Sequence, residues 1–477
     1  MKKLLIITTI LLLYTIATAQ QKDKSSQNIL YSNFINPPNT AKPRVWWHWM
    51  NGNITKDGIA KDLRWMERSG IGGFQNFDAA LMTPQIVKQR LTYMTPEWKD
   101  AFAFTTRLAD SLQLEMAIAG SPGWSESGGP WVKPEDGMKK IVWSEKRIEG
   151  GKAFAGKLLQ PPAVTGTFQN LSLQAQISLS APAEAPPQYY KDIAVLAYKL
   201  PDADIPLNVL KPAITSSGGH FNITQLTDGD LATTNLLPSD TIKGYAWIQF
   251  AFDQPQTIKA VTIVGGGDKG PFGLYGDFKD TRSLEASDNG ENFKRICYIP
   301  AGNVLQQTIS IPATTAKFFR ITIKNPPPKF SFGSLSGNNT TPQAPPGTEI
   351  GELVLHTASR INMFEEKAAF ATGGKFYEQA TPATNDIINE ADVIDITDKF
   401  SSDGILRWNT PAGNWNIVRY GFSLTGKQNH PASPEATGLE VDKLDAAAVK
   451  AYFSNYLDQY KSATKNLMGS KGLQFVV

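Results

Sequence analysis

Residues 44–52 read RVWWHWMNG, an apolar, tryptophan-rich run that ends in the turn-forming pair Asn51-Gly52. Because side chains alternate between the two faces of a β-strand, Trp47 and Trp49 are expected on one face, with Trp46 and His48 on the other. One pair is expected to face surrounding helices, and the pair nearest the loop to line a site. Core packing remains the alternative for each tryptophan, since large aromatic side chains are mostly buried.

Between residues 44 and 120 three expected strands alternate with two expected helices. A threonine precedes each of the two helices and can cap it, and in the second helix Pro96 and Glu97 suit the first turn. Alternating strands and helices predict a parallel sheet, in a barrel or in a doubly wound fold. The expected strands are 44–49, 72–77 and 114–120; the expected inner faces are Ile59, Leu63 and Met66, then Trp98, Ala101, Phe102, Thr105, Leu108 and Leu112.

The amino-terminal residues 1–19 carry two lysines, an apolar run and small residues at the end, which is typical of a secretory signal. The apolar run is too short for a membrane anchor, the alternative reading. Cys297 is the only cysteine, so no internal disulfide and no lipid anchor beside the cleavage site is expected. The net charge of +3 gives no indication of nucleic acid as a partner. These features predict a periplasmic or secreted protein.

Beyond about residue 141 the pattern changes to short β-like runs with proline, glycine and serine between them. The parallel pattern returns with a strand at 414–422, a helix carrying Val449, Phe453, Tyr456 and Tyr460 on one face, and a strand beginning at residue 473. Five parallel strands are then expected, three fewer than a (β/α)8 barrel has. The expected fold class is α/β plus β, an incomplete TIM-type barrel interrupted by an antiparallel β-sandwich. The expected segments are 33–145 (barrel), 146–210 (β-rich connection), 211–357 (sandwich), 358–412 (β-rich) and 413–477 (barrel, truncated).

Loops that leave the carboxyl ends of parallel strands lie on one face of the sheet, where active sites form. Here these loops are rich in glycine, serine, asparagine, tryptophan and carboxylates, with almost no lysine or arginine. Such a surface suits a neutral carbohydrate, because aromatic faces pack against C–H groups while amides and acids bind hydroxyls. His48 has a buried core histidine as its alternative reading. The expected substrate-binding residues are Trp47, His48, Trp49, Asn51, Asn76, Asp78, Ser121, Trp124 and His430.

The last of these loops, residues 423–442, contains three carboxylates, Glu435, Glu440 and Asp442. Glycoside hydrolysis needs two carboxyl groups, one to protonate the leaving oxygen and one to activate water or attack. Glu440 lies between Leu439 and Val441, so desolvation favours it as the catalytic acid. The alternatives are that Glu435 belongs to a solvated loop and that Asp442 caps the following helix.

Metal ligation has one candidate. The four histidines show no metal-ligand spacing. In the segment LTDGDLATT, Asp228, Asp230 and nearby carbonyls could hold calcium, although a plain Asp-Gly turn explains the segment equally well.

Three stretches together resemble glycoside hydrolase family 106, the bacterial α-L-rhamnosidases. They read FINPPNTAKPRVWWHWMNGNITKDGIAKDLRWMERSGIGGFQNFDA, GSPGWSESGGPWV and PASPEATGLEVDKLD, and the likeness covers about residues 33–145 and 404–477. The resemblance implies a barrel interrupted by β-domains, an inverting mechanism with a glutamate pair, Glu440 as the general acid, and calcium. Residues 211–357 resemble a discoidin-type, galactose-binding-like sandwich, which implies a structural calcium shared by the Asp228–Asp230 turn and Glu352.

Family members extend well beyond this length, so the second catalytic carboxylate is expected after residue 477, and this chain alone is expected to be inactive. Two other readings stay open. One is a non-catalytic carbohydrate-binding protein, and the other is a barrel glycosidase of a different sugar, because single residues do not reveal sugar identity. The sandwich is expected either to bind sugar or to serve only as a spacer.

Overall fold

The computed structural model describes residues 28–81, 83–166, 168–169, 171, 187–231, 233–265, 281–300, 304–326, 346–370, 380–464, 467–468 and 473–475. The chain forms two compact units. Unit 1 contains the described residues up to Gly137 and from Lys427 onward, and unit 2 contains those between Met138 and Gly426. The expected signal segment 1–19 and most of the loop 326–347 lie outside the described residues.

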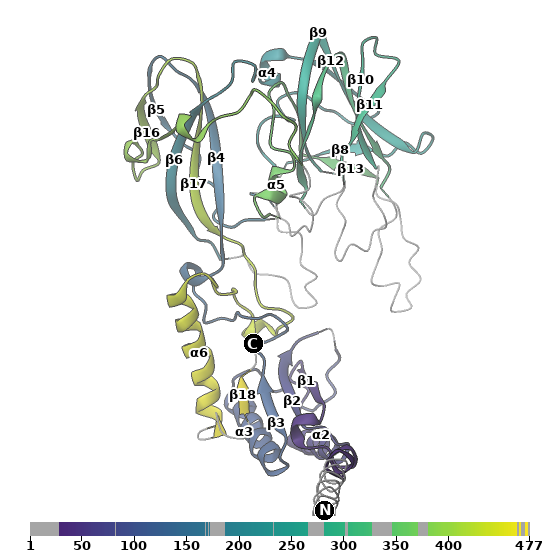
Figure 1. Cartoon of the computed structure of the whole chain (residues 1–477), viewed down its shortest axis with the longest axis vertical. Coiled ribbons are helices and arrows are strands. Elements are labelled where there is room, and N and C mark those ends of the chain that lie inside the picture. The colour runs from purple at the N-terminus through teal and green to yellow at the C-terminus, as the bar shows by residue number, and fades with distance from the viewer. Residues whose placement is uncertain are drawn as a thin grey trace, which may run out of the picture. The chain divides into compact units, whose positions relative to one another are not determined.

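Unit 1 is built on a parallel four-stranded sheet with the order β1-β2-β3-β18 (Figure 1). Strands and helices alternate along the first part of the chain, as the sequence predicts. The strands are β1 (Arg44–Met50), β2 (Gly73–Ala79), β3 (Glu115–Ile118) and β18 (Leu473–Phe475), and the helices are α2 (Lys56–Arg68), α3 (Pro96–Ser111) and α6 (Ala446–Thr464).

The helices of unit 1 begin at capping side chains. Thr55 Oγ1 accepts the amide of Gly58 at 3.1 Å, and Thr95 caps α3. Both caps were expected from the sequence and are confirmed. In α6 the cap is Asp445, whose Oδ1 accepts the amide of Ala447 at 2.9 Å. Asp442, for which capping was the alternative reading, lies three residues earlier and accepts the amide of Leu444, so that alternative is wrong.

The predicted alternation along β1 is confirmed, and the structure shows which face is buried. Trp49 is fully buried, with its ring centroid 5.4 Å from Trp98 of α3 and 5.7 Å from Trp47. On the opposite face Trp46 is 70% exposed, and the ring of His48 stacks on Phe77 at 5.0 Å. Trp49 therefore belongs to the core and does not reach the rim.

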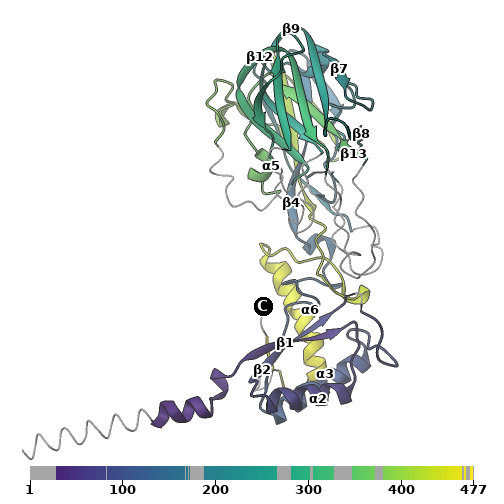
Figure 2. The ribbon, with the colours of Figure 1, turned by 90° about the vertical axis from the view of Figure 1, so that its right-hand side faces the viewer.

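Helices α2 and α3 lie side by side, with α6 next to α3 (Figure 2). Their buried side chains form one core with the Trp49 face of the sheet, including Ile59, Leu63, Met66, Trp98, Phe102, Tyr452, Tyr456 and Tyr460. A doubly wound sheet is covered by helices on both faces. In the part of unit 1 that is described, all three long helices contribute side chains to the core on the Trp49 face.

The strand expected at 414–422 does not join the parallel sheet. It is β17 (Asn414–Leu424), which pairs antiparallel with β4 (Lys139–Glu149) and β6 (Tyr190–Lys199) in unit 2. The parallel sheet therefore has four described strands rather than five. The prediction failed because an apolar run indicates a buried strand but not the direction of its neighbours. The same sheet includes β15 (Val393–Asp395), and β5 (Ala153–Lys157) pairs with β16 (Ile405–Asn409).

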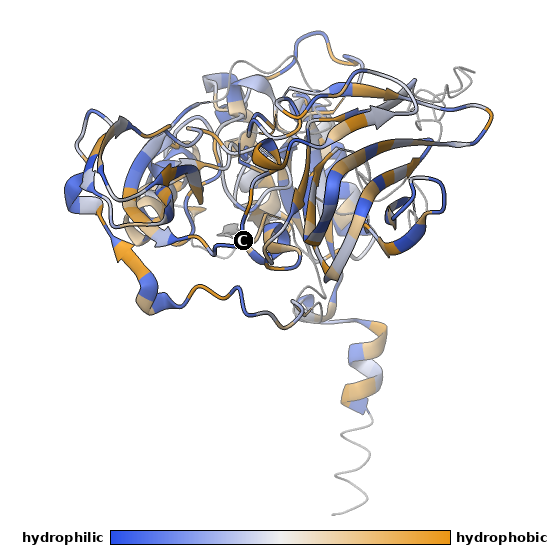
Figure 3. Ribbon diagram, turned by 90° about the horizontal axis from the view of Figure 1, so that it is seen from above, coloured by the Kyte–Doolittle hydropathy of each residue, from blue (hydrophilic) through white to orange (hydrophobic). Residues whose placement is uncertain are grey.

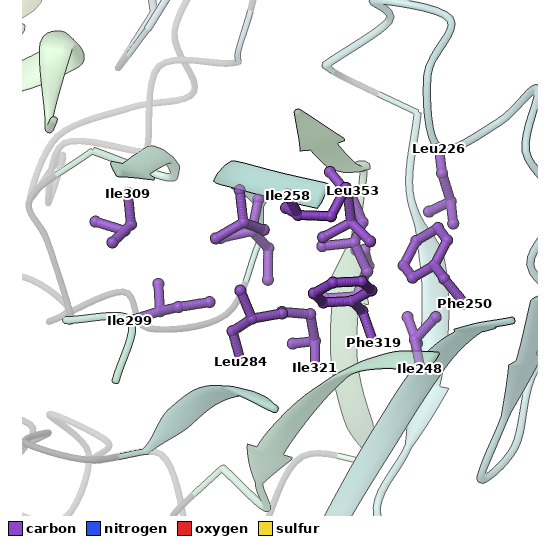
Figure 4. Close-up of a cluster of buried hydrophobic side chains, with 14 of the residues drawn as sticks. Leu226, Ile248, Phe250, Ile258, Leu284, Ile299, Ile309, Phe319, Ile321 and Leu353 are labelled. Carbon is purple, nitrogen blue, oxygen red and sulfur yellow. The ribbon is translucent and has the colours of Figure 1, made fainter. Parts of the chain in front are cut away.

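The remainder of unit 2 contains a larger antiparallel sheet with the order β11-β10-β12-β9-β14, to which β7 adds on β9. Hydrophobic and hydrophilic residues alternate along its long strands (Figure 3), and the inward side chains form the core drawn in Figure 4. The strands are β7 (Ala213–Ser216), β9 (Tyr245–Val264), β10 (Arg282–Ser287), β11 (Lys294–Tyr298), β12 (Gln306–Lys324) and β14 (Glu352–His356), and β8 (Asn235–Pro238) pairs with β13 (Gly347–Ile350). Two short helices are α4 (Leu207–Leu210) and α5 (Phe364–Lys367).

Candidate functional site

The candidate site lies in unit 1, where two long loops interlock at the carboxyl end of the parallel sheet. Loop 3 is residues 121–131, after β3, and loop 4 is residues 427–441, before α6. The side chain of Asn429 is 1% exposed and joins them. Its Nδ2 donates to Pro122 O at 2.9 Å, and its Oδ1 accepts the amide of Gly438 at 2.8 Å. A buried amide with both ends bonded fixes the two loops relative to each other.

Two glycines allow this close approach. Gly123 has a φ of +84°, and a Cβ there would lie 2.7 Å from the carbonyl carbon of His430. At Gly438 a Cβ would overlap the backbone of Gly129. Any larger residue at either position would push the loops apart.

The loop after β2 joins the same assembly. The amide of Gly123 donates to Asp78 O at 2.7 Å, and the amide of Ala80 donates to Pro431 O at 3.2 Å. On the side of the sheet that the helices cover, the hydroxyl of Tyr456 in α6 donates to Ala119 O at 2.8 Å. Loop 3, loop 4 and the end of β2 are therefore held together by backbone bonds.

An aromatic surface lies on the exposed face of this end of the sheet. It consists of Trp46, His48 and Trp124, and the buried ring of Phe77 packs against Trp46 and His48. Trp124 Nε1 donates to His48 Nε2 at 2.8 Å, and the Trp124 side chain remains 52% exposed. Because Nε2 accepts this bond, His48 carries its proton on Nδ1 and is neutral. Partial burial lowers the pKa of His48, which favours the same form.

Asp78, near the end of β2, is a buried acid whose side chain lies on the core face of the sheet with Trp49. It is 8% exposed, and its Oδ2 accepts a 2.8 Å hydrogen bond from Trp98 Nε1. Burial raises the pKa of Asp78 to about 7, the bond from Trp98 opposes that rise, and the charge of Glu435 adds to it. Glu435 lies at the tip of loop 4, in the short turn η8 (Pro434–Ala436), and is exposed.

Glu440 lies at the base of loop 4, and its side chain is 14% exposed. Lys443 Nζ is 2.7 Å from Glu440 Oε2 and 3.3 Å from Glu126 Oε2 of loop 3. The two glutamates and the lysine form one ion-paired group. Burial alone would lower the pKa of Lys443, but the two carboxylates raise it above its usual value, so the lysine stays charged.

Five of the expected binding residues, Trp47, Trp49, Asn51, Asn76 and Ser121, pack in the core or hold a loop in place. Trp47 and Asn76 lie on the core face of the sheet with Trp49. The Asn51 amide bonds to Leu81 O and Thr83 Oγ1, which fixes the loop after β2. Ser121 is 1% exposed and donates to Ser125 O within loop 3.

Of the other four expected residues, His48, Trp124 and His430 are brought together by the interlocked loops. The Asp78 side chain lies instead on the core face of the sheet with Trp49 and bonds to Trp98 of α3. His430 O accepts the amide of Trp124 at 2.8 Å. Sequence reasoning missed Trp98, Glu126 and Lys443. Lys443 could have been found from its spacing of three residues from Glu440, whereas the other two contacts join distant segments.

The expected calcium ligands lie in unit 2. Gly229 N donates to Glu352 Oε1 at 2.7 Å, and Asp230 N donates to Asp228 Oδ1 at 2.8 Å. Burial raises the pKa of Glu352 to about 7, the Gly229 amide opposes the rise, and Asp228 and Asp230 add to it. Crowded carboxylate oxygens are the donors that calcium prefers. Nevertheless, no three acidic, histidine or cysteine side chains among the described residues are arranged closely enough to hold a metal.

No helix among the described residues is both long and apolar enough to cross a bilayer.

The sequence profile of glycoside hydrolase family 106, described as alpha-L-rhamnosidase, matches residues 35–477. A solved rhamnosidase from Novosphingobium sp. PP1Y is 41% identical, with a TM-score of 0.77, over 93% of this chain and 39% of that protein. A curated protein from Formosa agariphila named putative beta-glucuronidase is 24% identical over 92% of this chain and 23% of its own length. The chain thus spans well under half the length of either relative.

The family match extends over both interlocked loops, the aromatic surface and Glu440. By this match, the chain belongs to the alpha-L-rhamnosidase family of glycoside hydrolases.

Proposed function

We propose that the protein is an exported glycosidase that removes terminal α-L-rhamnose from plant-type polysaccharides or glycosides with inversion. Family membership supports the reaction class, and the signal-like residues 1–19 support export. The single observation that carries the proposal is the assembly at the carboxyl end of the sheet. There an exposed tryptophan from loop 3, a neutral histidine from β1 and a largely buried glutamate from loop 4 are combined, and the two loops are fixed to one another. The parallel sheet is, in this proposal, part of a (β/α)8 barrel that unit 2 interrupts.

We assign each of these groups a role. The face of Trp124 packs against the C–H groups of the sugar, and His48 keeps its indole in place. Glu440 protonates the leaving oxygen as the general acid, oriented by Lys443. A second carboxylate activates water on the opposite side of the ring. In inverting enzymes the two carboxyl groups are about 6.5–9.5 Å apart, which leaves room for that water.

The full-length protein is expected to hydrolyse an aryl α-L-rhamnoside and to release β-L-rhamnose first, as ¹H NMR of early time points would show. Trp124→Ala is expected to raise KM roughly 5- to 30-fold, because losing a large aromatic contact costs about 1–2 kcal/mol of binding. The matched control is Trp65→Ala, which removes another half-exposed tryptophan, on α2, and should leave KM unchanged. Release of α-L-rhamnose first would contradict inversion, and an unchanged KM in the Trp124 variant would remove Trp124 from the site.

A different sugar is the second candidate, because the Formosa agariphila relative is named putative beta-glucuronidase. An aryl β-D-glucuronide in the same assay separates the two. Cleavage of the glucuronide without cleavage of the rhamnoside would favour the second candidate. Sugar binding without cleavage of either substrate would favour the non-catalytic reading.

We also propose, from the resemblance to a discoidin-type sandwich, that calcium binds at Asp228, Asp230 and Glu352 and supports unit 2 structurally. The three carboxylates are not arranged as a metal site in this structure, so binding would require them to move together. The folded-state pKa of Glu352 is above its unfolded value of 4.5, so its contribution to stability is present at low pH and is lost as pH rises through about 7. A cation there would replace the proton. At pH 8, calcium is therefore expected to raise the melting temperature relative to chelator, by about 2–4 °C per kcal/mol.

Glu352→Gln is expected to abolish both the calcium effect and its share of the pH dependence, whereas the exposed Glu291→Gln should change neither. Equal melting temperatures with calcium and with chelator at pH 8 would contradict calcium binding at this turn.

A further inference from the structure

Unit 2 contains a cavity that the proposed function does not use. Its volume is about 660 Å³, which is within the range of about 300–1,000 Å³ that is typical of ligand pockets. It lies where the β5–β16 pair packs on the sheet of β4, β6 and β17 (Figure 1), and Leu158 after β5 and Ile417 of β17 share the core between them. All the residues that line the cavity belong to unit 2.

One wall of the cavity is fixed by Arg419 of β17, which is 6% exposed. Its guanidinium donates to both carboxylate oxygens of Asp192, at 2.7 and 2.9 Å, and to Leu158 O at 3.1 Å. Gly404 has a φ of +84° and lies in the turn before β16. A Cβ there would lie 3.8 Å from Arg419 Nη1 and 3.7 Å from Lys157 Cε, so these two cationic side chains converge on the same turn.

The two carboxylates in the lining are already bonded to neutral groups. Glu145 of β4 accepts Trp143 Nε1 at 3.2 Å on one oxygen and Asn416 Nδ2 at 2.8 Å on the other. Asp403 accepts the hydroxyl of Ser401 at 2.5 Å within its own turn. Among the residues that the structure describes, neither acid forms an ion pair with a lysine of the lining.

Two exposed lysines of the lining, Lys146 of β4 and Lys157 of β5, keep their ammonium groups available. Neither forms an ion pair or a side-chain hydrogen bond within the described part of the chain. Lys146 Nζ lies over the ring of Phe154, 5.9 Å from its centroid. Because Asp192 already pairs with Arg419, the charged donors left for a ligand are these two ammonium groups, which bind carboxylates through charge-assisted hydrogen bonds.

The rest of the lining suits a sugar ring. Leu159 is 78% exposed, and Ser144 Oγ donates to its carbonyl at 2.5 Å, which holds the segment in place. The side chains of Gln160 and Ser402 form no hydrogen bond with any other described residue. An aliphatic side chain packs against the C–H groups of a sugar, and unused amide and hydroxyl groups bind its hydroxyls. A small inorganic anion would use neither.

We infer that this cavity binds a hexuronic acid residue of a glycan, with its carboxylate held by Lys146 and Lys157 and its hydroxyls by Gln160 and Ser402. The inference goes beyond the proposed function, because it gives unit 2 a binding site for an acidic sugar whereas the residues proposed to cleave the rhamnoside belong to unit 1. Inorganic phosphate is the competing ligand, since ammonium groups also bind phosphate oxygens.

The test is calorimetric titration of the full-length protein, at low ionic strength, with D-galacturonate and D-galactose and with D-glucuronate and D-glucose. Each pair differs only at C6, where a carboxylate replaces a hydroxymethyl group. At least one uronate is expected to bind about tenfold or more tightly than its neutral partner. Lys146→Gln and Lys157→Gln are each expected to weaken that binding about 3- to 10-fold and to leave binding of the neutral sugar unchanged.

Two further variants serve as controls. Lys157→Arg retains the positive charge and is expected to keep the affinity for the uronate within about threefold of the wild-type value. Lys294→Gln removes an exposed lysine of β11, in the other large sheet of unit 2, and should match the wild type. Melting temperatures of all four variants should equal that of the wild type, because exposed side chains contribute little to stability.

The outcomes separate this inference from the proposed function. Equal affinities for both uronates and their neutral partners, or an unchanged uronate affinity in both glutamine variants of the lining, would overturn it. Lysine-dependent binding of inorganic phosphate without binding of either uronate would also overturn it, in favour of a simple anion site. The proposed function is tested separately, by hydrolysis of an aryl rhamnoside, which the lysine variants are expected to catalyse as the wild type does.

Discussion

Replacing Glu440 with glutamine is expected to lower kcat/KM for an alkyl α-L-rhamnoside by about 100- to 10,000-fold, the usual contribution of a general acid. Glu440 is the largely buried carboxyl of loop 4, and Lys443 orients it from 2.7 Å. Glutamine has the same shape and still accepts a hydrogen bond from Lys443, but it has no proton to give to the leaving oxygen. The measurement is steady-state hydrolysis by the full-length protein, with the melting temperature compared to confirm that the fold is retained.

Comparing substrates with different leaving groups tests the role of Glu440 more sharply than the size of the loss in kcat/KM on one substrate. A dinitrophenyl rhamnoside has a leaving group that needs little protonation, so Glu440→Gln is expected to hydrolyse it with only a small loss. Glu135→Gln, which removes an exposed acid of the same unit, serves as the control and should match the wild type on both substrates. Equal losses on the two substrates would show that Glu440 is not the acid, and full activity of the variant would remove it from the mechanism.

Replacing Trp49 with alanine is expected to destabilise unit 1 by about 3–5 kcal/mol, as for other large aromatic side chains in cores. Trp49 has no exposed surface, and its ring packs edge-on against Trp47, Trp98 and Phe102. The alanine side chain would leave a cavity between β1 and α3 that the surrounding rings cannot fill. Urea unfolding followed by far-UV circular dichroism measures the change.

Trp46→Ala is the control for this prediction, because Trp46 is in the same strand but on its exposed face. It is expected to change the free energy of unfolding by less than about 1 kcal/mol. Similar losses in the two variants would mean that the face of β1 toward the helices is not the buried one.

The first three strands and the helices between them could be predicted because their signals are local. Threonine caps, proline in the first turn and spacings of three and four residues all act within one helix, and the helices α2 and α3 begin where these signals occur. The strand at 414–422 was assigned to the wrong sheet since its partners, β4 and β6, are distant in sequence. An apolar run specifies burial, whereas the direction of pairing depends on the rest of the fold.

The candidate site could be predicted only in part, for a related reason. Trp124 stands among glycine, serine and proline in a loop without hydrophobic periodicity, so its exposure could be anticipated. For Trp49, alternation gave the correct pairing with Trp47 but not which face the helices would cover. The environments of Asp78 and Glu440 depend on Trp98, Glu126 and Lys443, and most of these contacts arise only when the loops interlock.

A crystal structure of the full-length protein with L-rhamnose tests the sugar-binding site most directly. The sugar ring should lie against the face of Trp124, with a carboxyl oxygen of Glu440 within hydrogen-bond distance of one of its oxygens. A sugar bound only among the antiparallel strands of unit 2, or against Trp124 with Glu440 out of reach, would contradict the account.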